Sequence, residues 1–139
     1  MLRPKMILID LDGTLVDSVP DLAYCVDEMM IRLGRPPRGA AAVRNWVGNG
    51  VERLVRRALT GELDGEPPDA DYALAYPLFL ELYSENTSGR SMLYPGVREG
   101  LDYLRDLAEL FRGDAALVAA AYNAGEHAVV KHGVRRQMV

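Results

Sequence analysis

The pattern of apolar and polar positions along the chain predicts one buried strand near the N-terminus and a series of amphipathic helices after it. Residues 6–9 form an apolar run without alternation that ends at the carboxylate of Asp10. Such a run is typical of a strand that is buried on both faces of a parallel sheet. We therefore expect a strand at about residues 5–10, with Asp10 at its carboxyl end, where open α/β sheets place their ligands.

The helical pattern begins at Ser18, which can act as an N-cap, with Pro20 in the first turn and Gly34 as a stop. The expected helix over residues 18–33 carries one apolar stripe, which consists of Leu22, Cys25, Val26, Met29 and Leu33. A cysteine on such a stripe indicates a small buried side chain rather than a reactive thiol.

Two short helices are expected next, at residues 40–47 and 51–59, on either side of the sequence WVGNG. The second of them should bury Leu54, Val55 and Ala58. A longer helix follows at residues 69–85, and Pro77 should kink it or mark its true start. Its apolar side comprises Leu74, Leu78, Leu82 and Tyr83.

The last two predicted helices lie in the C-terminal part of the chain. One opens at Pro95, and its apolar stripe comprises Val97, Leu101, Leu104, Ala108 and Phe111. The other covers residues 114–125, where an alanine-rich segment favours helix, with Asp114 as N-cap and Gly125 as stop.

Composition narrows the class of protein. The chain has 139 residues, 49% of them hydrophobic and 26% charged, which fits one ordinary globular domain. A formal net charge of −4 gives no reason to expect a nucleic-acid partner, and a single cysteine excludes an internal disulfide framework. No apolar stretch reaches membrane-spanning length, and the N-terminal run is too short for a signal peptide. We therefore expect a cytoplasmic chain without a membrane partner.

Candidate chemistry gathers after the predicted strand, where Asp10 and Asp12 are two positions apart and Gly13 permits a positive φ. Two carboxylates that converge on a small volume favour a bound divalent cation or a raised pKa on one of them. Ligands that are all oxygen favour a hard cation such as Mg²⁺. One carboxylate could act as nucleophile while the other handles the proton. The alternative is a plain acidic turn after a strand.

The string DLDGTLVDS, residues 10–18, resembles the first motif of the haloacid dehalogenase superfamily of phosphatases. The resemblance implies an α/β fold with a Rossmann-like core and a helical cap. It also implies that Asp10 attacks phosphorus to form an aspartyl-phosphate, while Asp12 protonates the leaving oxygen and later activates water. Mg²⁺ would be held by Asp10 and by the backbone carbonyl of Asp12, and Thr14 would orient the loop beside the substrate.

The string WVGNG, residues 46–50, together with the later triplet RAL at residues 57–59, resembles the helical cap of phosphoglycolate phosphatases. The implied role is a loop that closes over the substrate, with Gly48, Asn49 and Gly50 as substrate-binding residues. Glycines leave the backbone N–H groups at a helix start free to meet an anion. The alternative is structural: Asn49 caps the next helix and Gly48 ends the previous one.

The phosphatase pattern continues to about residue 105, and the family's later motifs cannot be placed after it. These motifs are a second strand ending in Ser or Thr, a lysine and a further acidic pair. Residues 103–133 instead resemble the closing helices of lytic transglycosylases, which cleave peptidoglycan, and AAYNAG at 120–125 matches that family's substrate-groove motif. The catalytic Glu-Ser pair of that family is absent, so only Tyr122 and Asn123 could be vestiges of its site.

Together these resemblances define the expected organisation: a first core strand and catalytic loop at residues 1–17, a helical cap at 18–90, a helix returning to an incomplete core at 91–112, and a helical tail at 113–139. The leading function is Mg²⁺-dependent hydrolysis of a small phosphorylated metabolite such as 2-phosphoglycolate. The alternatives are a non-catalytic truncated or hybrid chain and a peptidoglycan-binding transglycosylase fragment. An apolar strand without neighbours also predicts self-association through that strand.

Overall fold

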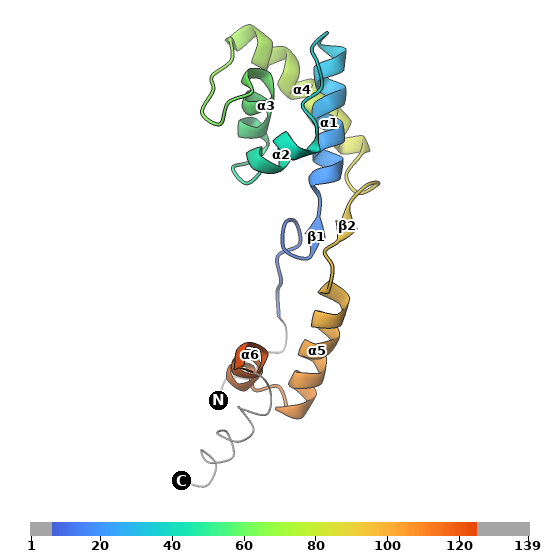
Figure 1. Cartoon of the computed structure of the whole chain (residues 1–139), viewed down its shortest axis with the longest axis vertical. Helices are drawn as coiled ribbons and strands as arrows, with labels where there is room; N and C mark the ends of the chain where they lie inside the picture. The colour runs from blue at the N-terminus through green and yellow to red at the C-terminus, as the bar shows by residue number, and fades with distance from the viewer. Residues whose placement is uncertain (1–6, 125–139) are drawn as a thin grey trace. The chain divides into compact units, whose positions relative to one another are not determined.

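The computed structural model describes residues 7–124, in which six helices and two very short strands are formed (Figure 1). The strands β1 (Val16–Asp17) and β2 (Met92–Leu93) pair as a two-stranded sheet. The chain divides into two compact units: one is Leu11–Met92, and the other contains, of the described residues, 7–10 and 93–124. The architecture is an incomplete α/β core with a helical cap, as the sequence predicts.

The first unit is built on four helices: α1 (Val19–Arg32), α2 (Ala40–Trp46), α3 (Val51–Thr60) and α4 (Asp69–Glu85). All four match the predicted ranges to within one or two residues. Helix α1 packs against each of the other three, and α3 packs against α4. Their facing side chains form one core that is closed to solvent, and its fully buried members include Val26, Met29, Met30, Val43, Val55, Ala58 and Phe79.

Helix α1 confirms most of the sequence prediction in detail. Pro20 lies in its first turn, and Gly34 adopts a positive φ of 72° after its end. The side chain of Ser18 makes no capping hydrogen bond; Asp17 Oδ1 instead accepts the N–H of Val19 at 3.3 Å. Cys25 is fully buried, and burial, with a smaller contribution from the charge of Asp21, raises the pKa of its thiol to about 11. The cysteine is therefore a packing residue and not a reactive thiol.

Helix α4 turns a different face to the core from the one predicted. Its buried residues are Ala75, Phe79 and Leu82, whereas Leu74 is 64% exposed. The predicted and the observed apolar stripes share Leu82 and are offset by about one residue around the helix. The observed stripe includes the ring of Phe79, which buries more apolar surface than a leucine does. Pro77 lies within the helix and does not mark its start.

The predicted strand at residues 5–10 is wrong in the part that the structure describes. Residues 7–10 adopt no strand, and Ile7, Leu8 and Ile9 are 65%, 84% and 43% exposed. A strand of this type needs hydrogen-bonded neighbours, and within residues 7–124 the strands are the two-residue pair β1 and β2. The apolar run therefore has no described neighbour that could hold it in a sheet.

The second unit contains α5 (Val97–Leu110) and α6 (Ala115–Ala124), which pack against each other. Asp114 caps α6 as predicted, because its Oδ1 accepts the N–H groups of Ala116 at 3.1 Å and Leu117 at 3.3 Å. The small core of this helix pair consists of Leu107, Val118 and Ala121. The stop predicted at Gly125 lies outside the described residues.

Leu107 also corrects the stripe predicted for α5. That stripe named Leu101, which is 39% exposed, and omitted Leu107, which is 2% exposed. The contacting partner α6 selects the face of α5 that is buried. No helix within residues 7–124 is long and apolar enough to cross a bilayer.

Candidate functional site

The acidic motif forms a tight loop around one backbone carbonyl. The carbonyl oxygen of Leu11 accepts the N–H groups of Thr14, Leu15 and Val16 at 3.2, 2.9 and 2.9 Å. Gly13 adopts a φ of 74° and donates its N–H to Val16 O at 2.9 Å. Only a residue without Cβ takes this conformation at little cost, so the predicted role of Gly13 in the turn is confirmed.

The two candidate catalytic carboxylates are both exposed. Asp12 and Thr14 belong to the tight loop of the first compact unit, whereas Asp10 belongs to the second unit. The carboxylate oxygens suit Mg²⁺ in donor type, because this ion takes few protein ligands and keeps several waters. Within residues 7–124 no group of three or more His, Cys, Asp or Glu side chains is placed to hold a metal ion.

The negative charge of Asp12 affects the ionisation of a tyrosine on α4. Tyr83 of α4 has a raised pKa, chiefly because the ring is partly buried and next because the negative charge of Asp12 opposes its ionisation. The Tyr83 ring also stacks on Phe79, with centroids 5.9 Å apart. The acidic loop thus lies within electrostatic reach of α4.

The end of the acidic motif is tied to α2. Arg44 donates from Nη1 and Nη2 to Asp17 Oδ1 and Oδ2, at 3.2 and 2.7 Å. This bidentate pair is the main reason that the pKa of Asp17 is lowered, with the N–H of Val19 adding to it and burial opposing it. Asp17 therefore ties the end of the motif to α2, and both of its carboxylate oxygens accept hydrogen bonds from Arg44.

The WVGNG loop connects α2 to α3. Helix α2 ends at Trp46, and Gly48 and Gly50 adopt positive φ values of 115° and 85°. Gly50 is the N-cap of α3, which has no capping hydrogen bond from a side chain. Asn49 Oδ1 instead accepts a hydrogen bond from Arg57 Nη1 at 3.0 Å, so the alternative in which Asn49 caps the next helix is wrong.

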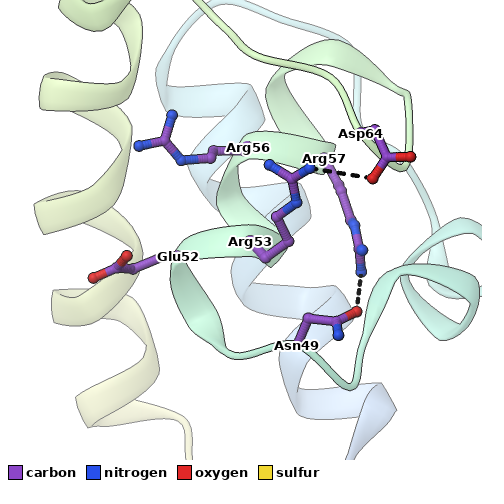
Figure 2. Close-up of a pocket in the computed structure, with 6 residues that line it drawn as sticks. All are labelled: Asn49, Glu52, Arg53, Arg56, Arg57 and Asp64. Carbon is purple, nitrogen blue, oxygen red and sulfur yellow. Dashed lines mark hydrogen bonds and ion pairs between the residues drawn. The ribbon is translucent and has the colours of Figure 1, made fainter.

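A pocket of about 440 Å³ opens beside this loop (Figure 2). Its lining comes from the loop, from α3 and from the segment after α3, and consists of Asn49, Glu52, Arg53, Arg56, Arg57 and Asp64. Of these residues, only Asn49 was predicted from the sequence as a site residue. The available signal was the cluster of three arginines in α3, followed by acidic residues at positions 62, 64 and 66.

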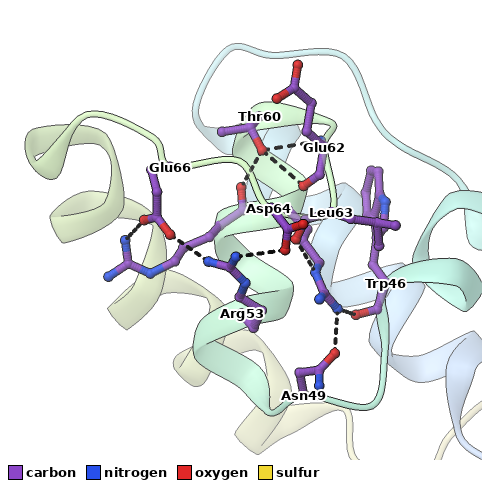
Figure 3. Close-up of polar contacts among 10 residues, drawn as sticks. Trp46, Asn49, Arg53, Thr60, Glu62, Leu63, Asp64 and Glu66 are labelled. Atoms are coloured by element: carbon purple, nitrogen blue, oxygen red, sulfur yellow. Dashed lines mark hydrogen bonds and ion pairs between the residues drawn. The ribbon is translucent and has the colours of Figure 1, made fainter.

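Two of the three arginines are neutralised by acidic side chains (Figure 3). Arg53 contacts Glu66 at 2.6 Å and Asp64 at 3.2 Å, and Arg56 contacts Glu66 at 2.7 Å. Hydrogen bonding by Arg53 is the largest cause of the lowered pKa of Glu66. These ion pairs hold the 61–66 segment against α3 and leave little net positive charge at the pocket for an anion.

A family model described as haloacid dehalogenase-like hydrolase matches residues 4–130 of the chain. The match includes the acidic loop, the helices α1–α6 and the segment AAYNAG.

Two curated relatives carry the name phosphoglycolate phosphatase. The protein from Nitrosococcus oceani is 62% identical over 103 residues, which cover 74% of this chain and 46% of that protein. The protein from Pseudomonas putida is 53% identical over 105 residues, which cover 73% of this chain and 38% of that protein. The chain therefore spans less than half the length of these relatives.

Among solved structures, the chain is similar to a predicted phosphoglycolate phosphatase from Haemophilus somnus. The TM-score is 0.58 at 34% identity, and the match covers 70% of this chain and 44% of that one. The helical arrangement described above is thus shared with a solved structure, again over less than half of its length.

Proposed function

The chain belongs to the haloacid dehalogenase-like hydrolases, and on that premise we propose that it carries the nucleophile loop and cap of a Mg²⁺-dependent phosphatase for a small phosphomonoester such as 2-phosphoglycolate. The observation that carries the proposal is the tight DLDGT loop, in which Gly13 takes the positive φ that the motif requires. The high identity to relatives named phosphoglycolate phosphatase supports the substrate.

In the proposed reaction each residue of the motif has one role. An oxygen of Asp10 bonds to phosphorus while the ester P–O bond breaks, and Asp12 gives its proton to the leaving oxygen. Asp12 then takes a proton from the water that hydrolyses the aspartyl-phosphate. Bound Mg²⁺, held by Asp10 and the Asp12 carbonyl, would supply charge stabilisation at the phosphoryl group. Thr14 would orient the loop, and Gly48, Asn49 and Gly50 would meet the substrate from the cap.

The direct test is phosphate release from 2-phosphoglycolate by the full chain, with and without Mg²⁺. We expect turnover that stops when the metal is chelated and returns when Mg²⁺ is added. A generic aryl phosphate tests the chemistry independently of the cap, because it needs no specific contact. No turnover of either compound would favour the alternative of a non-catalytic truncated or hybrid chain.

Metal binding can be measured without turnover. We expect calorimetric titration to show only weak binding of Mg²⁺, because Asp10 and Asp12 supply few protein ligands. The Asp10→Ala variant should lose that binding, whereas Asp102→Asn, an exposed change on α5, should keep it. Equal binding by Asp10→Ala would place the ion at another site.

The exposed apolar run supports a further proposal, that the chain self-associates through it. Ile7 and Leu8 are 65% and 84% exposed, and an exposed apolar segment is a template for pairing with another chain. Sedimentation equilibrium should show association that weakens in Leu8→Lys. The matched control is Leu74→Lys, which places the same charge at an exposed leucine of α4. A monomer at all concentrations would contradict the proposal.

We also propose that the chain is cytoplasmic. A separate alternative is that the tail, which resembles lytic transglycosylases, binds peptidoglycan. The segment AAYNAG falls within the residues matched by the hydrolase family, and α6 packs on α5 through the rings of Tyr103 and Tyr122, whose centroids are 6.0 Å apart. Retention of the chain on insoluble peptidoglycan, lost in Tyr122→Ala, would favour the second family.

A further inference from the structure

Arg57 of α3 is a buried guanidinium that connects two loops. It is only 7% exposed. Its Nη1 donates to the carbonyl of Trp46 at 2.6 Å and to Asn49 Oδ1 at 3.0 Å, and its Nε donates to the carbonyl of Leu63 at 2.8 Å. Figure 2 shows Asn49 turned toward Arg57, and Figure 3 shows Trp46 and Leu63 close to Asn49 in the same group of polar contacts. One side chain thus joins the loop before α3 to the loop after it.

The neighbouring arginines of α3 contact carboxylates instead of amide oxygens. Arg53 and Arg56 pair with Asp64 and Glu66, at positions where the arginine side chains are 28% exposed. Arg57 has no carboxylate partner within residues 7–124, and its three hydrogen bonds described above all reach amide oxygens. Because this buried guanidinium donates to carbonyl oxygens and not to a carboxylate, the directions of its N–H donors contribute to the fold in addition to its charge.

The loop between Trp46 and Val51 packs on the core through Val47, and its two glycines have open surroundings. Gly48 and Gly50 both adopt positive φ, and a Cβ added at either position would meet nothing within 4 Å. The two contacts from Arg57 Nη1 fall on Trp46 and Asn49, on either side of Gly48. These two contacts therefore limit the backbone conformations that Gly48, which lies between them, can sample.

We propose that Arg57 is a positioning residue that holds residues 47–50 in the conformation in which they would meet the substrate. The link to substrate rests on the function proposed above; the link to the loop rests on the geometry alone. Arg57 acts through the Trp46 carbonyl and the Asn49 amide and does not itself contact the substrate. A lysine cannot replace it, because an ammonium group lacks the fixed planar fork that reaches both loops at once.

The test compares Arg57→Lys with Arg53→Lys, which makes the same change one turn earlier on α3. Three readouts are taken from the full chain: amide hydrogen exchange, fluorescence and steady-state kinetics. In Arg57→Lys we expect exchange of peptides covering residues 47–50 and 61–65 to rise about tenfold or more, because both loops lose a charge-assisted contact. Arg53→Lys should leave exchange at residues 47–50 unchanged.

Fluorescence reports on the same loop, because Trp46 is the single tryptophan of the chain. In Arg57→Lys, but not in Arg53→Lys, the emission wavelength of Trp46 should shift and its indole ring should become more accessible to a neutral quencher. For turnover of 2-phosphoglycolate, we expect KM to rise about tenfold with kcat changed by less than about threefold, while KM for an aryl phosphate stays near that of the wild type. A purely structural role would lower the apparent kcat for both substrates and leave KM unchanged, because fewer molecules would be folded.

Failure of this proposal can be told from failure of the proposed function. Unchanged exchange at residues 47–50 in Arg57→Lys overturns the positioning role, whatever the kinetics show. Faster exchange with unchanged KM overturns the link to substrate. If the wild type has no turnover, the proposed function and the link to substrate both fail, and the loop part stands or falls on exchange alone. If Arg57→Lys does not fold, Asn49→Ala replaces it and should speed exchange at residues 47–50 but not at 61–65.

Discussion

Replacing Asp10 with asparagine should reduce phosphate release by about 10³-fold or more, in any preparation of the chain that turns over a phosphomonoester. The amide keeps the shape of the carboxylate but cannot attack phosphorus as an anion. Because Asp10 is exposed, its substitution should leave the unfolding midpoint unchanged. The loss would therefore come from the chemistry and not from the fold. The measurement is initial rate against 2-phosphoglycolate and an aryl phosphate at saturating Mg²⁺.

Two further variants make this result specific. Asp12→Asn should also lose turnover, because the leaving oxygen then has no acid to protonate it. Asp102→Asn should retain full activity, since Asp102 is an exposed residue of α5 that pairs with Arg105 at 3.1 Å. Undiminished turnover in Asp10→Asn would remove the assigned nucleophile and with it the proposed mechanism. Mass spectrometry of the quenched wild type offers a second measurement, because the phosphoryl group should be found on the peptide that contains Asp10.

The helices were predictable because each carries its own signals. Pro20 and Gly34 mark the ends of α1, and Asp114 marks the start of α6, through local backbone effects that depend little on the rest of the molecule. The choice of buried face was less predictable. On α4 the stripe through Phe79 and the stripe through Leu74 fit the same period, and only packing against α1 and α3 decides between them.

The strand predicted at residues 5–10 was wrong because, unlike a helix, a strand depends on a distant part of the chain. A strand has no hydrogen bonds of its own, so the apolar run at residues 6–9 becomes a strand only if another part of the chain pairs with it. The sequence shows the apolar run but not the partner. The loop after it was still predictable, because its contacts lie within the motif itself: the Gly13 N–H donates to Val16 O, and the N–H groups that follow Gly13 donate to Leu11 O.

The pocket residues were missed because the sequence does not show which partners they contact. A run containing Arg53, Arg56 and Arg57 is usually a solvated helix face, and nothing in its spacing separates the buried arginine from the two partly exposed ones. The separation appears only when the segment after α3 folds back, which places Leu63 O beside Arg57 and Glu66 beside Arg53. Asn49 was identified, but as a cap or substrate ligand and not as an acceptor for Arg57.

Asp21 is the buried charge that joins the start of the helical unit to its end. It is fully buried in the first turn of α1. Its Oδ1 accepts the N–H of Arg90 at 2.9 Å, and its Oδ2 accepts a hydrogen bond from the hydroxyl of Ser91. The guanidinium of Arg90 lies 3.8 Å from the same carboxylate and 3.5 Å from the centroid of the Tyr24 ring. The side chain therefore pins residues 90–91, just before β2, onto α1.

Asp21→Asn should lower the free energy of unfolding by about 2–4 kcal/mol, because it removes the charge from hydrogen bonds in a site closed to solvent. The transition can be followed by the fluorescence of Trp46, which lies in the same compact unit, during urea titration. Asp102→Asn serves as the matched control, and its exposed ion pair should contribute too little to detect. Ser91→Ala should cost less than Asp21→Asn, since the backbone contact from Arg90 remains.

The pH dependence of this effect has a definite sign. Burial raises the pKa of the Asp21 carboxyl, but hydrogen bonds from Ser91 and the N–H of Arg90, with the charge of Arg90, outweigh burial and leave the pKa below its ordinary value. The stabilisation is therefore complete above the unfolded pKa of about 3.9 and is lost as pH falls through the lower folded value. The difference between wild type and Asp21→Asn should be constant from pH 6 to about pH 5 and shrink below about pH 4. A difference that grew on acidification would mean that Asp21 is protonated in the folded chain, and would overturn its role as the charged clamp between α1 and residues 90–91.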